Sequence, residues 1–178
     1  MEQNMIEQKE QKDPAFQEMS LEIPLAVGDL APSFNMEASG GRRVSLDALK
    51  GVPFVLYFYP RANTPGCTQE ALDFSHALTE LTQRGVSVIG VSRDILKKLD
   101  SFANKYNLTF PLASDADGQA SVAYGVWVQK TLYGKTSMGI ERATYLVNAQ
   151  GRIVHIWRKV KVSGHVTAVL NEIIKRGL

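Results

Sequence analysis

The sequence predicts a single α/β domain in which helices flank a central mixed β-sheet, and two observations support this fold class. First, residues 53–59 (PFVLYFY) and 86–92 (VSVIGVS) are dense apolar runs typical of buried strands, and a helical pattern separates them. A strand, a helix and a strand in close succession indicate a right-handed parallel crossover. Second, the apolar runs 143–147 and 152–157 are joined by a four-residue turn, which indicates an antiparallel hairpin.

The N-terminal part of the domain is predicted from its glycines and polar breaks. Residues 28–34 (GDLAPSF) open the domain, and a Ser-Gly-Gly break at 39–41 separates them from 42–45, which predicts a β-hairpin. Ser45 is a suitable cap for a short turn over 46–50.

Three helices are predicted from apolar residues that recur at spacings of three and four. The first helix covers 67–84 and ends at Gly85. After the second helix we expect a short strand at 110–113 and then a loop with a helical turn at 114–124. A hairpin, a strand–helix–strand unit, a second hairpin and a terminal helix follow the order of the thioredoxin fold, here with an N-terminal β-hairpin extension. The positions that mark the helices are Ala71, Phe74, Leu78 and Leu81, then Ile95, Leu99, Phe102 and Tyr106, and finally Val166, Val169, Leu170, Ile173 and Ile174.

Composition and charge argue against two classes of partner. The 178 residues carry a formal net charge of +2, and the basic residues are scattered, so we expect no nucleic-acid partner. The apolar stretches are far shorter than the ~20 residues of a membrane helix, so we expect no membrane partner. Residues 1–22 are rich in Glu, Gln and Lys without an apolar core, which predicts a flexible polar tail rather than a secretory signal, before a domain over 23–178. We therefore expect a cytoplasmic protein.

Cys67 is the only cysteine of the sequence. A single cysteine rules out an internal disulfide, a Cys-rich zinc site and a Cys-x-x-Cys redox pair. The three histidines, at positions 76, 155 and 165, lack metal-ligand spacing, so we expect no metal and no cofactor. In a reducing cytosol, a lone thiol is either an inert core residue or a reactive nucleophile.

The segment around Cys67 favours the reactive alternative. The predicted strand brings the chain to its carboxyl end, where ligands bind in open α/β sheets. Thr64 is a good N-cap, Pro65 suits the first helical position, and Gly66 leaves room for close approach. Cys67 then lies in the first helical turn, where unpaired amide groups and the helix dipole favour an anion such as a thiolate.

The pattern Pro60-x-x-x-Thr64-x-x-Cys67 matches the active-site motif of the peroxiredoxins. The sequence resembles the bacterioferritin comigratory protein (PrxQ-type) subgroup of that family over nearly everything from Gly28 to the C-terminus. The matching blocks are GDLAPSF at 28–34, YFYPRANTPGCTQEA at 57–71, VIGVSRD at 88–94, FANKYNLTFPLASD at 102–115, YGVW at 124–127 and YGKTSMGIERATYLV at 133–147.

The resemblance implies a thiol-dependent peroxidase that reduces hydrogen peroxide and organic hydroperoxides. It implies that Cys67 is the peroxidatic cysteine, whose thiolate attacks a peroxide oxygen and becomes a sulfenic acid. The Thr64 hydroxyl and the Cys67 amide would donate to the reacting oxygens, and Pro60 would shape the pocket and shield the thiolate. Arg142 matches the family's arginine from a distant strand, and a guanidinium suits the role because it stays protonated and presents a fork of donors. If the Thr64 side-chain oxygen caps the helix by accepting a hydrogen bond from a backbone amide, its hydroxyl proton stays free to bond the thiolate or the peroxide.

Other interpretations of these side chains remain open from the sequence alone. Arg142 could form a surface ion pair with the adjacent Glu141, and Arg61 and Arg93 compete for the cationic role. The simplest interpretation of the remaining candidates is structural: core packing for Tyr57, Phe58 and Tyr59, helix-surface carboxylates for Glu70 and Asp73, and structural histidines for His155 and His165.

The sequence departs from the subgroup at the resolving cysteine. Many members carry one five residues after the peroxidatic cysteine or in the following helix, but here that position is Leu72 and residues 94–108 contain none. The resemblance therefore implies a one-cysteine variant whose sulfenic acid is reduced by an external thiol: thioredoxin, glutaredoxin or glutathione. We expect a monomer or a weak homodimer.

Two other functions compete with the peroxidase. One is a thioredoxin-fold redox sensor or chaperone-like module with little turnover, in which Cys67 forms mixed disulfides with a partner. The other is a Cys–His hydrolase, for which the sequence has histidines but no triad signature.

Overall fold

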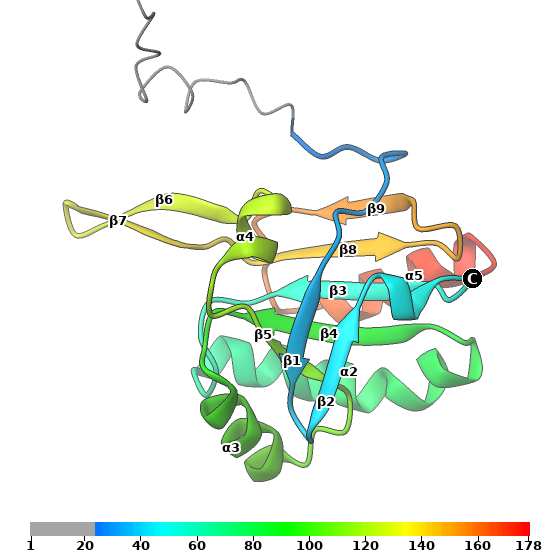
Figure 1. Ribbon diagram of the computed structural model, residues 1–178, viewed down its shortest axis with the longest axis horizontal. Coiled ribbons are helices and arrows are strands. Elements are labelled where there is room, and N and C mark those ends of the chain that lie inside the picture. The colour runs from blue at the N-terminus through cyan, green and yellow to red at the C-terminus, as the bar shows by residue number, and fades with distance from the viewer. Residues whose placement is uncertain (1–23) are drawn as a thin grey trace, which may run out of the picture.

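The computed structural model describes residues 24–178, and it is drawn in Figure 1. The predicted polar tail at 1–22 and the domain boundary at residue 23 lie outside the described residues. Within this part of the chain, no helix is long and apolar enough to cross a membrane.

A seven-stranded mixed sheet forms the centre of the domain, in the order β2-β1-β5-β4-β3-β8-β9. The three inner strands β5, β4 and β3 run parallel to one another, and β8 and β9 continue antiparallel from β3. The N-terminal hairpin β1–β2 joins the other edge antiparallel to β5. The strands are β1 (Asn35–Ala38), β2 (Arg42–Ser45), β3 (Phe54–Phe58), β4 (Ser87–Ser92), β5 (Leu112–Ser114), β8 (Ala143–Val147) and β9 (Ile153–Trp157).

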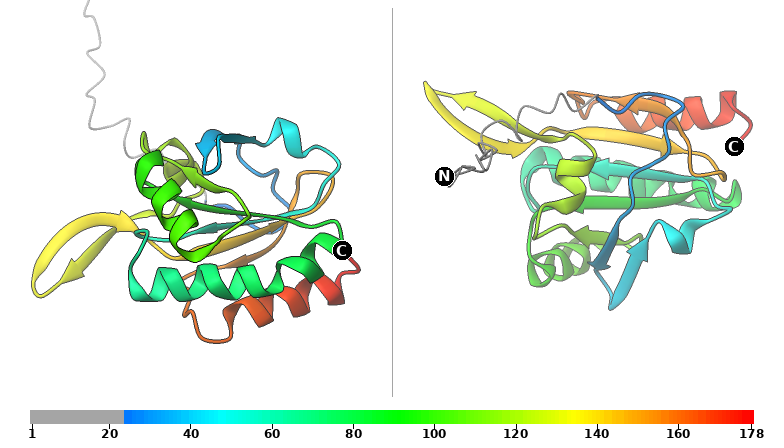
Figure 2. Two further views of the ribbon diagram at one scale, coloured as in Figure 1. Left: turned by 90° about the horizontal axis from the view of Figure 1, so that it is seen from below. Right: turned by 45° about the horizontal axis from the view of Figure 1, so that its top comes forward.

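Helices cover the two faces of the sheet unequally. Helices α2 and α5 lie side by side on one face, as Figure 2 shows, and apolar residues of α3 join the same cluster. The N-terminal segment and α4 cover the other face. The helices are α2 (Pro65–Gln83), α3 (Leu96–Tyr106), α4 (Gln119–Ala123), α5 (His165–Lys175) and the short 3₁₀ helix η1 (Asp47–Leu49).

Strand β3 divides the core into its two halves because successive side chains of a strand point to opposite faces. Val55 and Tyr57 belong to the cluster under α2 and α5, while Phe54, Leu56 and Phe58 belong to the opposite one. All five are buried, as expected for a central strand covered on both sides.

The predicted elements are confirmed with boundaries shifted by a few residues, including the N-terminal hairpin, the parallel β3–α2–β4 unit and the terminal helix. The turn after β8 also follows the prediction, since Asn148 Oδ1 accepts hydrogen bonds from the amides of Gln150 and Arg152, both at 3.0 Å. At the short turn near Ser45, Ser45 Oγ accepts from the Ala48 amide at 3.2 Å, although the N-cap residue of η1 is Leu46, one position later than predicted.

One hairpin was not predicted: β6 (Trp127–Leu132) and β7 (Lys135–Ile140) pair as a separate two-stranded sheet. It projects from the body of the molecule in Figure 1. Most of its side chains are exposed, so the apolar alternation that marks a half-buried strand is missing. The two-residue turn Tyr133-Gly134, with φ of 51° and 74°, was the available signal, since such turns favour positive φ.

Candidate active site

Cys67 lies in the first turn of α2, directly after the loop that follows β3. Thr64 is the N-cap residue and Pro65 the first helical residue, as the sequence predicts. The Thr68 amide donates to the Thr64 carbonyl at 2.8 Å, so the amides of Gly66 and Cys67 precede the first bond of the helix. Their N–H groups and the helix dipole favour negative charge at this end of α2.

The hydroxyl of Thr64 differs from the expected cap. It donates to the Arg61 carbonyl at 2.8 Å and makes no capping hydrogen bond. The sequence predicts that the Thr64 oxygen accepts a capping bond and that its proton stays free. The structure shows the reverse, because the proton is donated within the loop and the oxygen lone pairs stay available. The bond closes the loop 61–64 and holds the start of α2 in place.

Arg142 reaches the sulfur of Cys67 from the segment between β7 and β8. Its Nη2 donates to Cys67 Sγ at 3.3 Å, and its Nη1 donates to Glu70 Oε1 at 2.8 Å. The side chains of Arg142 and Glu70 are 16% and 1% exposed. The interpretation of Glu70 as a helix-surface carboxylate is therefore wrong, because Glu70 lies one turn after Cys67 and both side chains face Arg142.

The backbone around Arg142 is fixed by hydrogen bonds on both sides. The Glu141 amide donates to the Val126 carbonyl at 2.8 Å, and the Val160 amide donates to the Arg142 carbonyl at 3.0 Å. Glu141 pairs with Arg158 rather than with Arg142, which corrects the alternative of a Glu141–Arg142 surface ion pair.

Gly66 leaves room for the Arg142 guanidinium, in agreement with its predicted role of allowing another group to approach the backbone closely. A Cβ atom built on Gly66 would lie 3.4 Å from Arg142 Nη2. A larger side chain at this position would therefore press on the arginine that contacts Cys67.

The buried Glu70–Arg142 pair determines the electrostatics beside the sulfur. Burial raises the pKa of Glu70 from its ordinary 4.5 to about 7, although the charge of Arg142 opposes this change. Its second oxygen, Oε2, is buried and has no hydrogen-bond partner among the described residues. Burial works to lower the pKa of Arg142, but Glu70 and Cys67 outweigh it and raise that pKa above its ordinary value. Arg142 therefore stays a cation at the sulfur.

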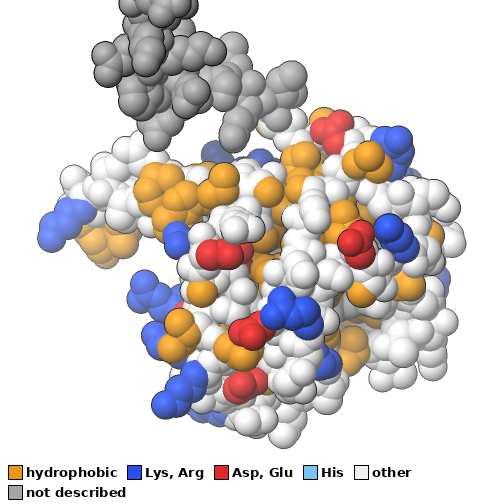
Figure 3. Space-filling model, in the orientation of Figure 1, with side chains coloured by type: hydrophobic (Ala, Val, Ile, Leu, Met, Phe, Trp, Pro, Cys, Tyr) orange, Lys and Arg blue, Asp and Glu red, His pale blue; other side chains and the backbone are white. Residues whose placement is uncertain are grey.

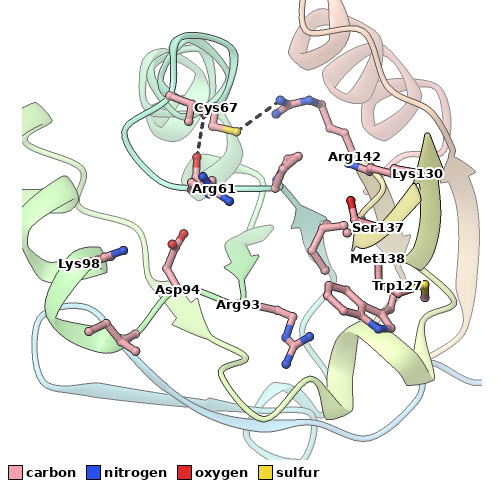
Figure 4. Close-up of a pocket in the computed structure, with 15 residues that line it drawn as sticks. Arg61, Cys67, Arg93, Asp94, Lys98, Trp127, Lys130, Ser137, Met138 and Arg142 are labelled. Atoms are coloured by element: carbon pink, nitrogen blue, oxygen red, sulfur yellow. Dashed lines mark hydrogen bonds between the residues drawn. The ribbon is translucent and has the colours of Figure 1, made fainter. Parts of the chain in front are cut away.

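A pocket of about 940 Å³ opens over Cys67, and Figure 4 shows the side chains that line it. Pro60 and Thr64 form part of its wall, so all four candidate site residues meet there. Lys130, from the β6–β7 hairpin, lines the opposite side, and burial, followed by the charge of Arg142, lowers its pKa. The pocket also contains Arg61, Arg93, Asp94, Ile95, Lys98, Trp127, Ser137, Met138, Gly139 and Ile140.

The two competing arginines line the same pocket without contacting the sulfur. Arg61 is exposed at the edge. Arg93 stacks on the Trp127 ring with its Cζ 4.2 Å from the ring centre, and its Nη2 donates to the Ala116 carbonyl at 3.4 Å. Neither donates a hydrogen bond to Cys67, so Arg142 holds the cationic position beside the thiol.

Of the three histidines, none lines the pocket over Cys67. Nε2 of His165 lies 2.7 Å from Thr144 Oγ1, and burial lowers the pKa of His165 to about 4. His155 pairs with Glu172 at 3.5 Å, and His76 is exposed on α2. The Cys–His hydrolase interpretation is therefore wrong, because no histidine is placed to act as its base.

Three aromatic residues at the end of β3 are buried in the core, and Tyr57 and Tyr59 share the apolar cluster that contains Cys67. Tyr57, Phe58 and Tyr59 are buried, which confirms their expected role in core packing. Tyr57 stacks on Phe74 of α2 with ring centres 4.5 Å apart, and this contact packs α2 against β3 about two helical turns after Cys67. Cys67 itself is 2% exposed.

Sequence reasoning missed Glu70 and the hairpin side of the pocket. The spacing of Glu70, three residues after Cys67, is the signal that could have placed both on one face of α2. No comparable signal marks Lys130, Trp127 or Met138, since they reach the pocket only through the unpredicted hairpin.

The arrangement suits chemistry at sulfur. A thiol at a helix N-terminus, next to a fixed guanidinium, can act as a thiolate nucleophile, and the guanidinium fork can stabilise charge that develops on a bound oxygen. Among residues 24–178, no three His, Cys, Asp or Glu side chains gather into a possible metal site.

Comparison with known proteins agrees with this chemistry. Residues 27–156 match the model of the AhpC/TSA family, so the chain belongs to that family. Its relatives place it within the family among the peroxiredoxins of the Bcp, or PrxQ, group. Peroxiredoxin Bcp of Xanthomonas campestris is 47% identical over 150 residues, which cover 84% of this chain and 91% of the relative.

Two solved structures give the same result for the fold. A cysteine-to-serine variant of Xylella fastidiosa PrxQ superposes with a TM-score of 0.83 at 39% identity and covers 88% of this chain and 99% of its own. The Xanthomonas campestris bacterioferritin comigratory protein, studied for its alkyl peroxide reduction, gives a TM-score of 0.78 at 43% identity and covers 82% and 92%. The chain thus has a thioredoxin-like peroxiredoxin fold, and it is an enzyme, a thiol-dependent peroxidase.

Proposed function

We propose that Cys67 is the peroxidatic cysteine and that Arg142, Thr64 and Pro60 complete the catalytic site. The observation that carries the proposal is the hydrogen bond of 3.3 Å from Arg142 Nη2 to Cys67 Sγ, in a pocket wide enough for a hydroperoxide. The same guanidinium is held in place by Glu70 at 2.8 Å. Charge stabilisation by such a fixed donor is worth most where water is excluded.

The reaction begins with attack of the Cys67 thiolate on the terminal oxygen of the hydroperoxide. A sulfur–oxygen bond forms as the O–O bond breaks, and the departing oxygen takes up a proton and leaves as water or an alcohol. Cys67 becomes a sulfenic acid. Arg142 stabilises the negative charge that moves from sulfur to the departing oxygen, together with the amide N–H groups at the start of α2.

Thr64 and Pro60 shape the approach to the sulfur. The Thr64 hydroxyl closes the loop before α2 through the Arg61 carbonyl, and its oxygen lone pairs can accept the proton of an incoming hydroperoxide. Pro60 has no amide hydrogen and lines the wall beside Cys67, where it keeps water from the thiolate.

Hydrogen peroxide and small organic hydroperoxides both suit this pocket. Its hairpin side carries Trp127, Met138 and Ile140, which can contact an alkyl group. The relative from Xanthomonas campestris, which covers most of this chain, is described by its alkyl peroxide reduction. That description supports the organic substrates here.

The sulfenic acid is reduced by an external thiol, because Leu72 stands at the resolving position and the chain has no second cysteine. A cytoplasmic location suits an enzyme that depends on reducing thiols. Thioredoxin, glutaredoxin and glutathione remain the expected classes of reductant, and the oligomeric state, monomer or weak homodimer, stays a prediction.

Peroxide consumption with an added thiol tests the proposal. The native chain should consume many equivalents of hydrogen peroxide, and trapping followed by mass analysis should find one sulfenic acid, on Cys67. The Cys67→Ser variant should consume none. Oxidation of Cys67 without repeated turnover, whichever thiol class is supplied, would instead support the redox-sensor function.

A further inference from the structure

The charges around the pocket mouth point to the nature of the reductant. We propose that the sulfenic acid of Cys67 is reduced by a small thiol that carries free carboxylates, bound at the cationic rim; this inference rests on the proposed peroxidase function. The cationic rim is defined as Arg61, Arg93, Lys98 and Lys130, which all line the pocket over Cys67.

The cationic rim surrounds the pocket from different elements. Figure 4 shows Arg61 and Lys98 on one side, Arg93 near the far end, and Lys130 on the hairpin side with Trp127. In Figure 3, basic side chains gather along the edge between the β6–β7 hairpin and α3. A ligand that enters the pocket therefore passes several positive charges.

The positive charge of the rim is not balanced nearby. Asp94 is the one carboxylate among the described residues that line this pocket. Its Oδ2 already accepts from the Ala62 amide at 2.7 Å and from Ser92 Oγ at 2.8 Å. Glu70 does not line the pocket, and its carboxylate forms an ion pair with Arg142.

None of the four rim side chains forms an ion pair within residues 24–178, whereas several other basic side chains of the chain do. Basic side chains that converge on a pocket without acidic partners attract anions and raise their local concentration. The structure thus offers a place for the carboxylates of a ligand whose thiol is directed at Cys67.

The burial of the sulfur favours a small thiol over a protein thiol. Cys67 is 2% exposed and lies at the start of a nineteen-residue helix that packs on the sheet and on α5. A thiol on a protein surface reaches that sulfur only if the first turn of α2 moves outward. A small thiol enters a pocket of about 940 Å³ without such movement, because pockets of about 300–1,000 Å³ hold complete small ligands.

The reaction balances with two thiols for each peroxide. The thiolate of the first thiol attacks Cys67 Sγ, a disulfide bond forms, the S–O bond breaks, and the hydroxide takes up a proton and leaves as water. A second thiolate attacks the ligand sulfur of this mixed disulfide and releases the Cys67 thiolate. The two thiols lose two electrons and leave as their disulfide.

Glutathione and its diethyl ester provide the test, because they share one thiol and differ in free carboxylates. The chain is oxidised with one equivalent of hydrogen peroxide, and the sulfenic acid on Cys67 is verified by mass analysis. Its reduction by each thiol is then followed by stopped flow, with rate constants expressed per thiolate. We expect glutathione to react about tenfold faster at low salt, and the ratio to fall with added salt.

Variants identify the charges responsible. The double variant Arg61→Gln/Lys98→Gln should lower the glutathione-to-ester ratio several-fold, while Lys175→Gln, an exposed lysine on α5, should leave it unchanged. Equal rates for the two thiols, or a ratio unaffected by the double variant, would overturn the inference, as would a sulfenic acid that only a protein dithiol reduces. In each of these results the sulfenic acid has formed, so the peroxidase function stands. Failure to form it would overturn both proposals.

Discussion

Replacing Glu70 by glutamine should change how the stability of the protein depends on pH. Glu70 is 1% exposed, and burial raises its pKa from 4.5 to about 7. Between these two pH values the folded protein binds one proton more than the unfolded chain, so this group makes the free energy of unfolding fall as pH rises. Its contribution is fully present below about pH 4.5 and is lost as pH rises through about 7.

The size of the effect follows from the two pKa values. One pKa unit corresponds to about 1.4 kcal/mol, so the difference between 4.5 and about 7 corresponds to about 3 kcal/mol. In the Glu70→Gln variant, the amide side chain has nearly the same shape as the carboxyl and no charge at any of these pH values. The variant should therefore be about as stable as the native chain at pH 4 and about 3 kcal/mol more stable relative to it at pH 8.

Urea unfolding of both proteins between pH 4 and pH 8 measures this difference. Glu80→Gln is the matched control, since Glu80 lies on the same helix but its side chain is 46% exposed and pairs with Arg84. Its difference from the native chain should stay within about 0.5 kcal/mol across the range. A difference for Glu70→Gln that does not change with pH would show that burial does not raise the pKa of Glu70. A variant that loses relative stability as pH rises would show that attraction to Arg142 outweighs burial.

Substitutions at three further positions test the site and the core beside it. Arg142→Leu should slow the oxidation of Cys67 by hydrogen peroxide by about 10²–10³-fold in stopped flow, and an unchanged rate would assign the cationic role elsewhere. Thr64→Val leaves the Arg61 carbonyl without its donor and should lower the free energy of unfolding by about 1 kcal/mol, whereas Thr64→Ser should retain it; equal losses would show that the hydroxyl bond contributes nothing. Tyr57→Phe removes a buried hydroxyl without a partner among the described residues, so thermal or urea unfolding should show a gain of about 1 kcal/mol, and a loss would show that the hydroxyl has a partner.

The part of the fold that positions Cys67 could be predicted because its signals are local. The apolar run of β3, the Thr64-Pro65 start of α2 and the Gly85 stop each specify their own element. The parallel pairing of β3 with β4 then follows from the helix between them. The projecting hairpin could not be predicted from apolar periodicity, because most of its residues are exposed.

The partners of Cys67 could not be predicted from local patterns. Arg142 lies 75 positions from Cys67 in the sequence, and only the family resemblance indicated it. The ion pair of the buried Glu70 likewise depends on Arg142 reaching it from that distant segment. The direction of the Thr64 hydroxyl depends on the loop geometry at 61–64, which residue identities alone do not define.

In the proposed mechanism, the start of α2 and the Arg142 guanidinium make Cys67 an efficient nucleophile toward the O–O bond. The most direct measurement is the second-order rate constant for oxidation of Cys67 by hydrogen peroxide, compared with free cysteine at the same concentration of thiolate. We expect a rate constant for the folded chain at least about 10²–10³-fold larger, the contribution of one fixed donor to the departing oxygen. A value equal to that of free cysteine thiolate would show that neither the helix start nor Arg142 activates Cys67.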